Sequence, residues 1–142
     1  MIVLEQLRLL FDFGLVVLIW MVQLIVYPSF KKYSKKDLIV WHKIYVKRIA
    51  VIVGPLMIGQ LLIATWQLYL VKSPYTILVF IFILFLWGFT FTHFAPLHQR
   101  ISNASFTLAN LAQLERRNWM RTVLWTLIFL WGLAEAVSYP ML

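Results

Sequence analysis

The sequence has no cysteine and few charged residues. Without cysteine the chain has no thiolate nucleophile, no iron–sulfur ligand, no cysteine-based zinc site and no disulfide scaffold. Charged residues make up 13% of the 142 residues, whereas soluble domains average about 25%. Hydrophobic residues make up 63%. These proportions exclude a water-soluble globule, a disordered chain and a coiled coil, and they predict an integral membrane protein.

Acidic residues are especially scarce. Thirteen Lys and Arg face five Asp and Glu, which gives a formal net charge of +8. In a soluble protein this excess would indicate a nucleic-acid partner. Here the basic residues lie in blocks between apolar runs, which is typical of charges that set membrane topology. We therefore expect a lipid bilayer as the partner and no nucleic acid.

The apolar residues form long runs, and about 20 residues are enough to cross the ~30 Å hydrocarbon core of a bilayer. Backbone groups in lipid must be satisfied within each segment, so each run is expected to be a helix. Pro28, Pro96 and Pro140 are expected to end three of these helices. The sequence predicts an all-α, four-helix transmembrane bundle, with residues 1–142 as a single domain. The expected spans are residues 9–27, 49–71, 75–95 and 120–139.

The basic residues also predict an orientation. Eleven Lys and Arg lie in the connections 29–48 and 97–121, whereas the other side has only Arg8 and Lys72. Cytoplasmic loops carry the excess of Lys and Arg. We therefore expect a multi-pass protein of the bacterial inner membrane with both long connections in the cytoplasm and both termini outside.

Both long connections have helical features. From Lys35 onward, apolar residues recur at helical spacing, so the second span should begin early as a cytoplasmic helix, with a kink at Gly54-Pro55. Ser105 is a candidate N-cap for a helix that runs into the fourth span. Helical cytoplasmic extensions are therefore expected on two spans.

The three histidines, His42, His93 and His98, all lie near the predicted cytoplasmic boundary. Imidazole is the commonest metal ligand and titrates near neutrality, so a metal, haem or proton-transfer site is one interpretation. His93 and His98 are five residues apart, which separates them by about 140° around a regular helix. Ordinary hydrogen bonds are the other interpretation, and the sequence identifies neither a metal site nor a cofactor.

Asn118, Arg121 and Trp125 share one face of the fourth predicted helix. A guanidinium at the membrane boundary is costly unless it is paired or reaches the headgroups. Arg121 is therefore either a snorkelling anchor or a group that holds a carbonyl or anionic oxygen of a ligand. Gln23 and Gln60 are polar at membrane depth, where they either bond neighbouring helices or face a cavity open to the cytoplasm.

Several short motifs, taken together, form a known pattern. They are Tyr27-Pro28, Trp41-His42 with Tyr45, Pro55, Pro96-Leu97-His98, and Asn118-Trp119-Met120-Arg121-Thr122 with Trp125. The chain resembles a largely uncharacterised family of bacterial four-span integral membrane proteins. That family is distantly similar to anthrone-oxygenase-like proteins, which share the Asn-x-x-Arg-Thr pattern. The resemblance implies a four-helix bundle and a small hydrophobic substrate, with no metal or organic cofactor. Gln60 departs from the pattern, which has an acidic residue there.

These features favour a membrane protein that binds a small hydrophobic molecule at the cytoplasmic face, with oxygenation or proton transfer as the expected chemistry if it acts on that molecule. His42 would be the general base, His98 a second acid–base group, and Arg121 with Asn118 would hold an oxyanion. The expected ligand-binding residues are Gln23, Trp41, Tyr45, Gln60, His93 and Trp125.

Two alternatives remain open. One is a non-catalytic accessory subunit of a larger membrane complex, or a homo-oligomer, that uses the apolar third span and the small residues Gly132 and Ala136 as contact faces. The other is a haem- or metal-binding electron carrier that uses His42 with His93 or His98.

Overall fold

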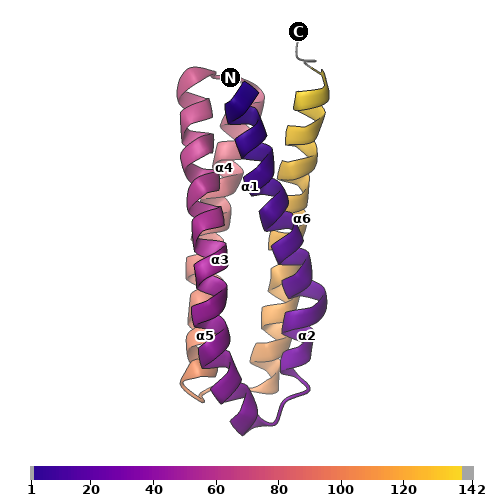
Figure 1. Ribbon diagram of the computed structural model, residues 1–142. Coiled ribbons are helices and arrows are strands. Elements are labelled where there is room, and N and C mark those ends of the chain that lie inside the picture. The colour runs from indigo at the N-terminus through magenta and orange to yellow at the C-terminus, as the bar shows by residue number, and fades with distance from the viewer. Residues whose placement is uncertain (1, 139–142) are drawn as a thin grey trace.

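The computed structural model describes residues 2–138, all of whose regular elements are helices (Figure 1). These helices form four long rods, each made of one helix or of consecutive helical segments. The rods run antiparallel and form a bundle, which confirms the all-α four-helix prediction. In chain order the elements are α1 (Ile2–Met21), a π-helical turn (Val22–Val26), α2 (Tyr27–Phe30), α3 (Lys35–Leu70), α4 (Pro74–Phe89), a second π-helical turn (Thr90–Phe94), α5 (Ala95–Ser102) and α6 (Leu108–Ser138).

Each rod is long and apolar enough to span a membrane, so the chain is a multi-pass membrane protein. The candidate spans contain 28, 36, 29 and 31 residues, and each exceeds the ~20 residues that a bilayer requires. Large apolar side chains cover the outside of the bundle, for example Val51 and Tyr69, which are 73% and 76% exposed. Exposure of this kind suits contact with lipid rather than water.

The two ends of the bundle differ in their connections. Residues 71–73 join α3 to α4 at the end that also carries Ile2 and Ser138, which we call the turn end (Figure 1). Residues 31–34 and 103–107 make the connections at the opposite end, which we call the loop end. The connection between α3 and α4 is a tight turn in which Ser73 caps α4: Ser73 accepts a hydrogen bond from the Thr76 N–H, and the Thr76 hydroxyl accepts one from the Ser73 N–H.

The expectation that Pro28 and Pro96 end their helices is wrong. Each proline lies in the first turn of a new α-helical segment that directly follows a π-helical turn. The N–H of Tyr27 bonds the carbonyl of Val22, and the N–H of Ala95 bonds that of Thr90. This longer i→i−5 register puts each proline where no N–H is needed. The rods therefore continue to Phe30 and Ser102. Pro140 lies outside the described residues.

The helical extensions are present, but one predicted cap is wrong. α3 runs as one helix from Lys35 through Pro55 to Leu70. α6 begins at Leu108 because Thr107 and Asn110 cap each other: the Thr107 N–H donates to Asn110 Oδ1, and the Asn110 N–H donates to Thr107 Oγ1. The Ser105 hydroxyl donates instead to the carbonyl of Arg100, so Ser105 is not the N-cap.

The interior divides into two clusters of buried side chains. α1 packs against α3 and α6, and α4 packs against α3 and α6. The cluster nearer the loop end contains Tyr27, Phe30, Tyr45 and Phe94, with aliphatic residues of α3, α5 and α6. The other contains Leu15, Ile83 and Trp125, with aliphatic residues from all four rods. Polar side chains are embedded beside both clusters.

Candidate functional site

A partly buried chain of hydrogen-bonding groups crosses the loop end of the bundle. Ser102 Oγ lies 3.0 Å from His42 Nδ1, and His42 Nε2 lies 2.8 Å from His98 Nδ1. His98 Nε2 lies 3.1 Å from the Tyr27 hydroxyl. The chain therefore connects α5, α3 and α2, and each imidazole uses both of its nitrogens.

The helix irregularities explain how these residues meet. Tyr27 opens α2 directly after the first π-helical turn, and His98 lies in α5 after the second π-helical turn and Pro96. A π-helical turn inserts one residue into the helix, which rotates everything beyond it by about 100°. His42 is fully buried in the regular helix α3. The rings of Phe30 and Tyr45 pack around it at 5.6 and 6.1 Å between centroids, and they hold it facing His98.

Arg121 lies inside the bundle beside this chain rather than outside at the headgroups. It is 7% exposed. Its guanidinium carbon lies 4.2 Å from the centre of the Phe94 ring and 5.3 Å from that of Trp125, which is cation–π geometry. The guanidinium also lies near the hydroxyls of Tyr27 and Tyr45. Its buried Nε has no hydrogen-bond partner, so one donor remains free for another group.

Asn118 shares the helix face of Arg121, as predicted, but it bonds to Gln23 and Thr122 rather than to the guanidinium. Its Nδ2 donates to Gln23 Oε1 at 2.9 Å, and the Gln23 amide donates to the carbonyl of Glu115 at 3.2 Å. The Thr122 hydroxyl also lies 3.4 Å from Gln23 Oε1. These contacts tie α6 to the first π-helical turn. The buried Asn118 Oδ1 has no partner, so it remains free as an acceptor.

Three of the expected ligand-binding residues lie away from this cluster. Trp41 is exposed on the outside of α3. His93 stacks on Phe89 at 4.4 Å and contacts the hydroxyl of its neighbour Thr92. Gln60 belongs to a different network. Helical spacing places His93 and His98 on different faces, and the second π-helical turn, which includes His93, does not bring them together.

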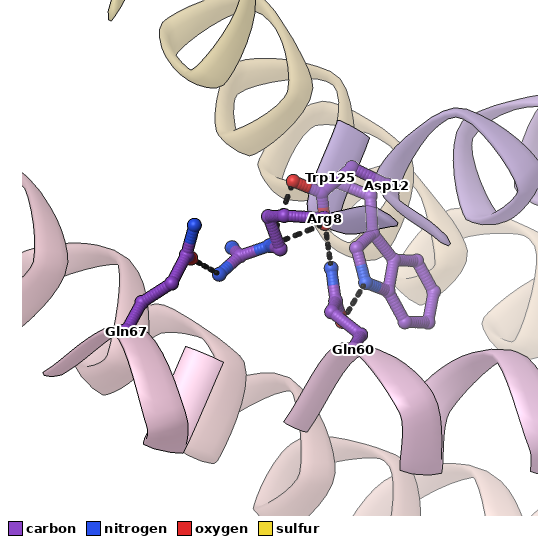
Figure 2. A network of polar contacts seen from close by, with 5 residues as sticks. All are labelled: Arg8, Asp12, Gln60, Gln67 and Trp125. Carbon is purple, nitrogen blue, oxygen red and sulfur yellow. Dashed lines mark hydrogen bonds and ion pairs between the residues drawn. The ribbon is translucent and has the colours of Figure 1, made fainter. Parts of the chain in front are cut away.

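The second network lies further towards the turn end (Figure 2). Arg8 Nε donates to both oxygens of Asp12, at 3.0 and 2.9 Å, and Arg8 Nη1 donates to Gln67 Oε1 at 3.2 Å. Gln60 Nε2 donates to Asp12 Oδ1 at 2.6 Å, and the Trp125 indole donates to Gln60 Oε1 at 3.2 Å. All five side chains are buried. Gln60 thus joins α3 to α1 and α6 instead of facing a cytoplasmic cavity.

Arg8 and Gln67 were not among the predicted site residues, although the sequence carries signals for both. Arg8 and Asp12 have opposite charges at i, i+4 within an apolar run, which places them on one helix face. Gln60 and Gln67 are seven residues apart and so share a face of α3.

The polar side chains gathered at the loop end, which we call the loop-end cluster, are Tyr27, His42, His98, Asn118 and Arg121. They combine acid–base groups with hydrogen-bonding atoms that have no partner. The chain of Tyr27, His98 and His42 can move a proton along hydrogen bonds. Arg121 Nε and Asn118 Oδ1 are a donor and an acceptor one helical turn apart. Among the described residues, no three His, Asp or Glu side chains gather as a metal site would require.

Comparison with known proteins gives no match: no family model matches the chain, and neither do curated proteins or solved structures. The resemblance to the four-span family therefore stays a prediction from the motifs.

Proposed function

We propose that the protein binds a small hydrophobic molecule at the loop end of the bundle and carries out proton-transfer chemistry on it. The observation that carries this proposal is the partly buried Tyr27–His98–His42 chain beside Arg121, whose buried Nε has no partner. Leaving a buried donor of a charged group unpaired costs free energy, so sites of this kind are candidates for ligand contacts. The loop end carries the blocks of basic residues, so we place it in the cytoplasm of a bacterium.

In this proposal each group has a distinct role. Arg121 donates to a carbonyl or developing anionic oxygen of the ligand, because a guanidinium surrounded by low-dielectric rings stabilises such charge strongly. Asn118 Oδ1 accepts from a ligand hydroxyl. The Tyr27 hydroxyl exchanges a proton with the ligand, and His98, His42 and Ser102 extend the path away from it. Phe94, Tyr45 and Trp125 would form the apolar walls.

Arg121→Lys tests this proposal. Lysine keeps the positive charge but loses the planar fork and the Nε donor. We expect at least a tenfold drop in the amount of small molecule that co-purifies with the protein, measured by mass spectrometry of solvent extracts, with the helical circular dichroism spectrum unchanged. The control is Arg116→Lys, because Arg116 is exposed on the same helix. Equal retention by Arg121→Lys and the wild type would make Arg121 a structural group only.

The accessory-subunit alternative has support from a different surface. An apolar groove of about 650 Å³ lies between α4 and α6 and is lined by Phe82, Phe85, Met120 and Val123 among others. A partner helix would suit this groove, and a stoichiometric protein partner in mild detergent would favour this function. The electron-carrier alternative is disfavoured, because the facing nitrogens of His42 and His98 bond each other and a metal between them would require the rings to separate.

A further inference from the structure

A separate cavity of about 360 Å³ opens at the turn end of the bundle. Its walls come from the first turns of α1, the α3–α4 turn and the last turns of α6. Its volume falls within the ~300–1,000 Å³ range of ligand pockets. The cavity lies at the opposite end of the rods from His42 and His98, so it is independent of the site described above.

The deep part of the cavity presents hydrogen-bond donors. Arg8 lines it and is 2% exposed, and its buried Nη2 has no partner although Nε and Nη1 bind Asp12 and Gln67 (Figure 2). Tyr75 also lines the cavity, and a Cβ placed on Gly132 would lie 3.0 Å from its hydroxyl and 3.9 Å from Asp12 Oδ2. Glycine at this position therefore leaves the Tyr75 hydroxyl room close to the Arg8–Asp12 pair.

The rim of the cavity has the opposite character. Glu5 and Glu135 line it, the first exposed and the second half-buried. The charged groups around the cavity are therefore the Arg8 guanidinium and three carboxylates, those of Glu5, Asp12 and Glu135. The charge of Arg8 is already neutralised by its ion pair with Asp12. This charge distribution disfavours an anionic ligand. It favours a neutral molecule that offers an acceptor to the deep donors and hydroxyls to the carboxylates at the rim.

The remaining walls are aliphatic. Leu4, Leu9, Leu70, Val71 and Ala136 supply them, and the cavity lies at the ends of helices that span a bilayer. An acyl chain can leave such a cavity towards the lipid while its polar group stays inside. We propose that this cavity binds a neutral hydroxylated lipid ester of the acylglycerol type: Arg8 Nη2 and the Tyr75 hydroxyl donate to the ester carbonyl, and the glycerol hydroxyls donate to Glu5 and Glu135.

The test is binding of monooctanoylglycerol to the full-length protein in lipid nanodiscs, measured by saturation-transfer NMR. The matched pair of variants is Ala136→Leu, which fills the cavity, and Ala134→Leu, which adds the same side chain to an exposed position of α6. We expect saturable binding to the wild type and to Ala134→Leu, and at least a tenfold loss in Ala136→Leu. Tyr75→Phe and Arg8→Lys should each weaken binding at least threefold.

Two further probes test the ligand chemistry. Octylglycerol ether, which has no carbonyl, and octanoate, which is an anion, should each bind at least tenfold more weakly than the ester. Equal binding of monooctanoylglycerol to Ala136→Leu and Ala134→Leu would overturn the cavity as the site. Tighter binding of octanoate than of the ester would overturn its assignment to neutral esters. Arg121→Lys should leave this binding unchanged, so its outcome is independent of the loop-end proposal.

Discussion

Asp12 is an acidic residue within the apolar stretch of α1. It is fully buried and accepts hydrogen bonds from Arg8 and Gln60. Ionised groups are costly at membrane depth unless they are paired. The Arg8–Asp12 ion pair therefore determines how α1 is rotated about its axis, because any other rotation would expose a charge to lipid.

Removal of Asp12 alone should destabilise the bundle strongly. Asp12→Leu leaves Arg8 buried and unpaired, and breaking a buried pair in this way costs about 3–5 kcal/mol. The double variant Arg8→Met/Asp12→Leu removes both charges and should recover most of this loss, because well-packed apolar residues often replace a buried ion pair without cost. Reversible unfolding in mixed micelles measures both. A single variant as stable as the wild type would show that water reaches Arg8.

Trp125 contacts polar groups on both sides: the Arg8–Asp12 network and Arg121 at the loop end. Its indole N–H donates to Gln60, and its ring lies against the Arg121 guanidinium. The indole N–H is a donor only, so it cannot pass a proton from one network to the other. The loop-end chain and the Arg8–Asp12 network are therefore separate for proton transfer although they share this side chain.

Among the elements, the two π-helical turns determine which side chains meet at the loop end. They precede Pro28 and Pro96 and rotate α2 and α5 relative to α1 and α4. The spacing of apolar residues predicts a long apolar helix, but it does not reveal the single extra residue that a π-helical turn inserts into that helix. For this reason the sequence located the four spans and the loop-end level of His42, His98 and Arg121, whereas the pairing of Tyr27 with His98 and the position of His93 required the structure.

Deletion of Ile25 should test the role of the first π-helical turn. Ile25 is 63% exposed, so its loss removes little packing, but the turn becomes regular α-helix and Tyr27 rotates by about 100° away from His98. Pro28 would then lie within a continuous helix, which costs about 3 kcal/mol. Adding Pro28→Ala should recover part of this stability without restoring the Tyr27–His98 contact.

The measurements for these variants are thermal unfolding and the NMR signals of His98. Ile25→Ala is the control, because it removes the same side chain and keeps the chain length. An unchanged His98 signal in the deletion variant would contradict the proposed role of the π-helical turn.

At the scale of the whole molecule, the hydrophobic runs were sufficient to predict the architecture, because lipid permits few alternatives to a helix for each span. The contacts between the rods were less predictable. Gln60 was expected either to bond a neighbouring helix or to face a cytoplasmic cavity, and its amide joins Asp12 and Trp125. Such contacts depend on how each rod rotates about its axis, and a single sequence with several polar residues on each helix permits more than one solution.

The orientation of the bundle is a separate prediction. Because the chain has no native cysteine, single cysteines report their side of the membrane without background labelling. We expect Tyr33→Cys at the loop end to react with an impermeant maleimide only after cells are permeabilised. Lys72→Cys at the turn end should react in intact cells. The reverse pattern would place the loop end outside.

The most direct test of the central claim is the ¹⁵N NMR spectrum of the three histidine side chains, before and after extraction of the co-purified small molecules. A ligand held beside His98 and Arg121 predicts that the His42 and His98 signals change on extraction and return when the extract is added back. The His93 signal, which comes from a ring stacked on Phe89 outside the cluster, should stay constant. Unchanged His42 and His98 signals, with small molecules demonstrably removed, would contradict a ligand site at the loop end.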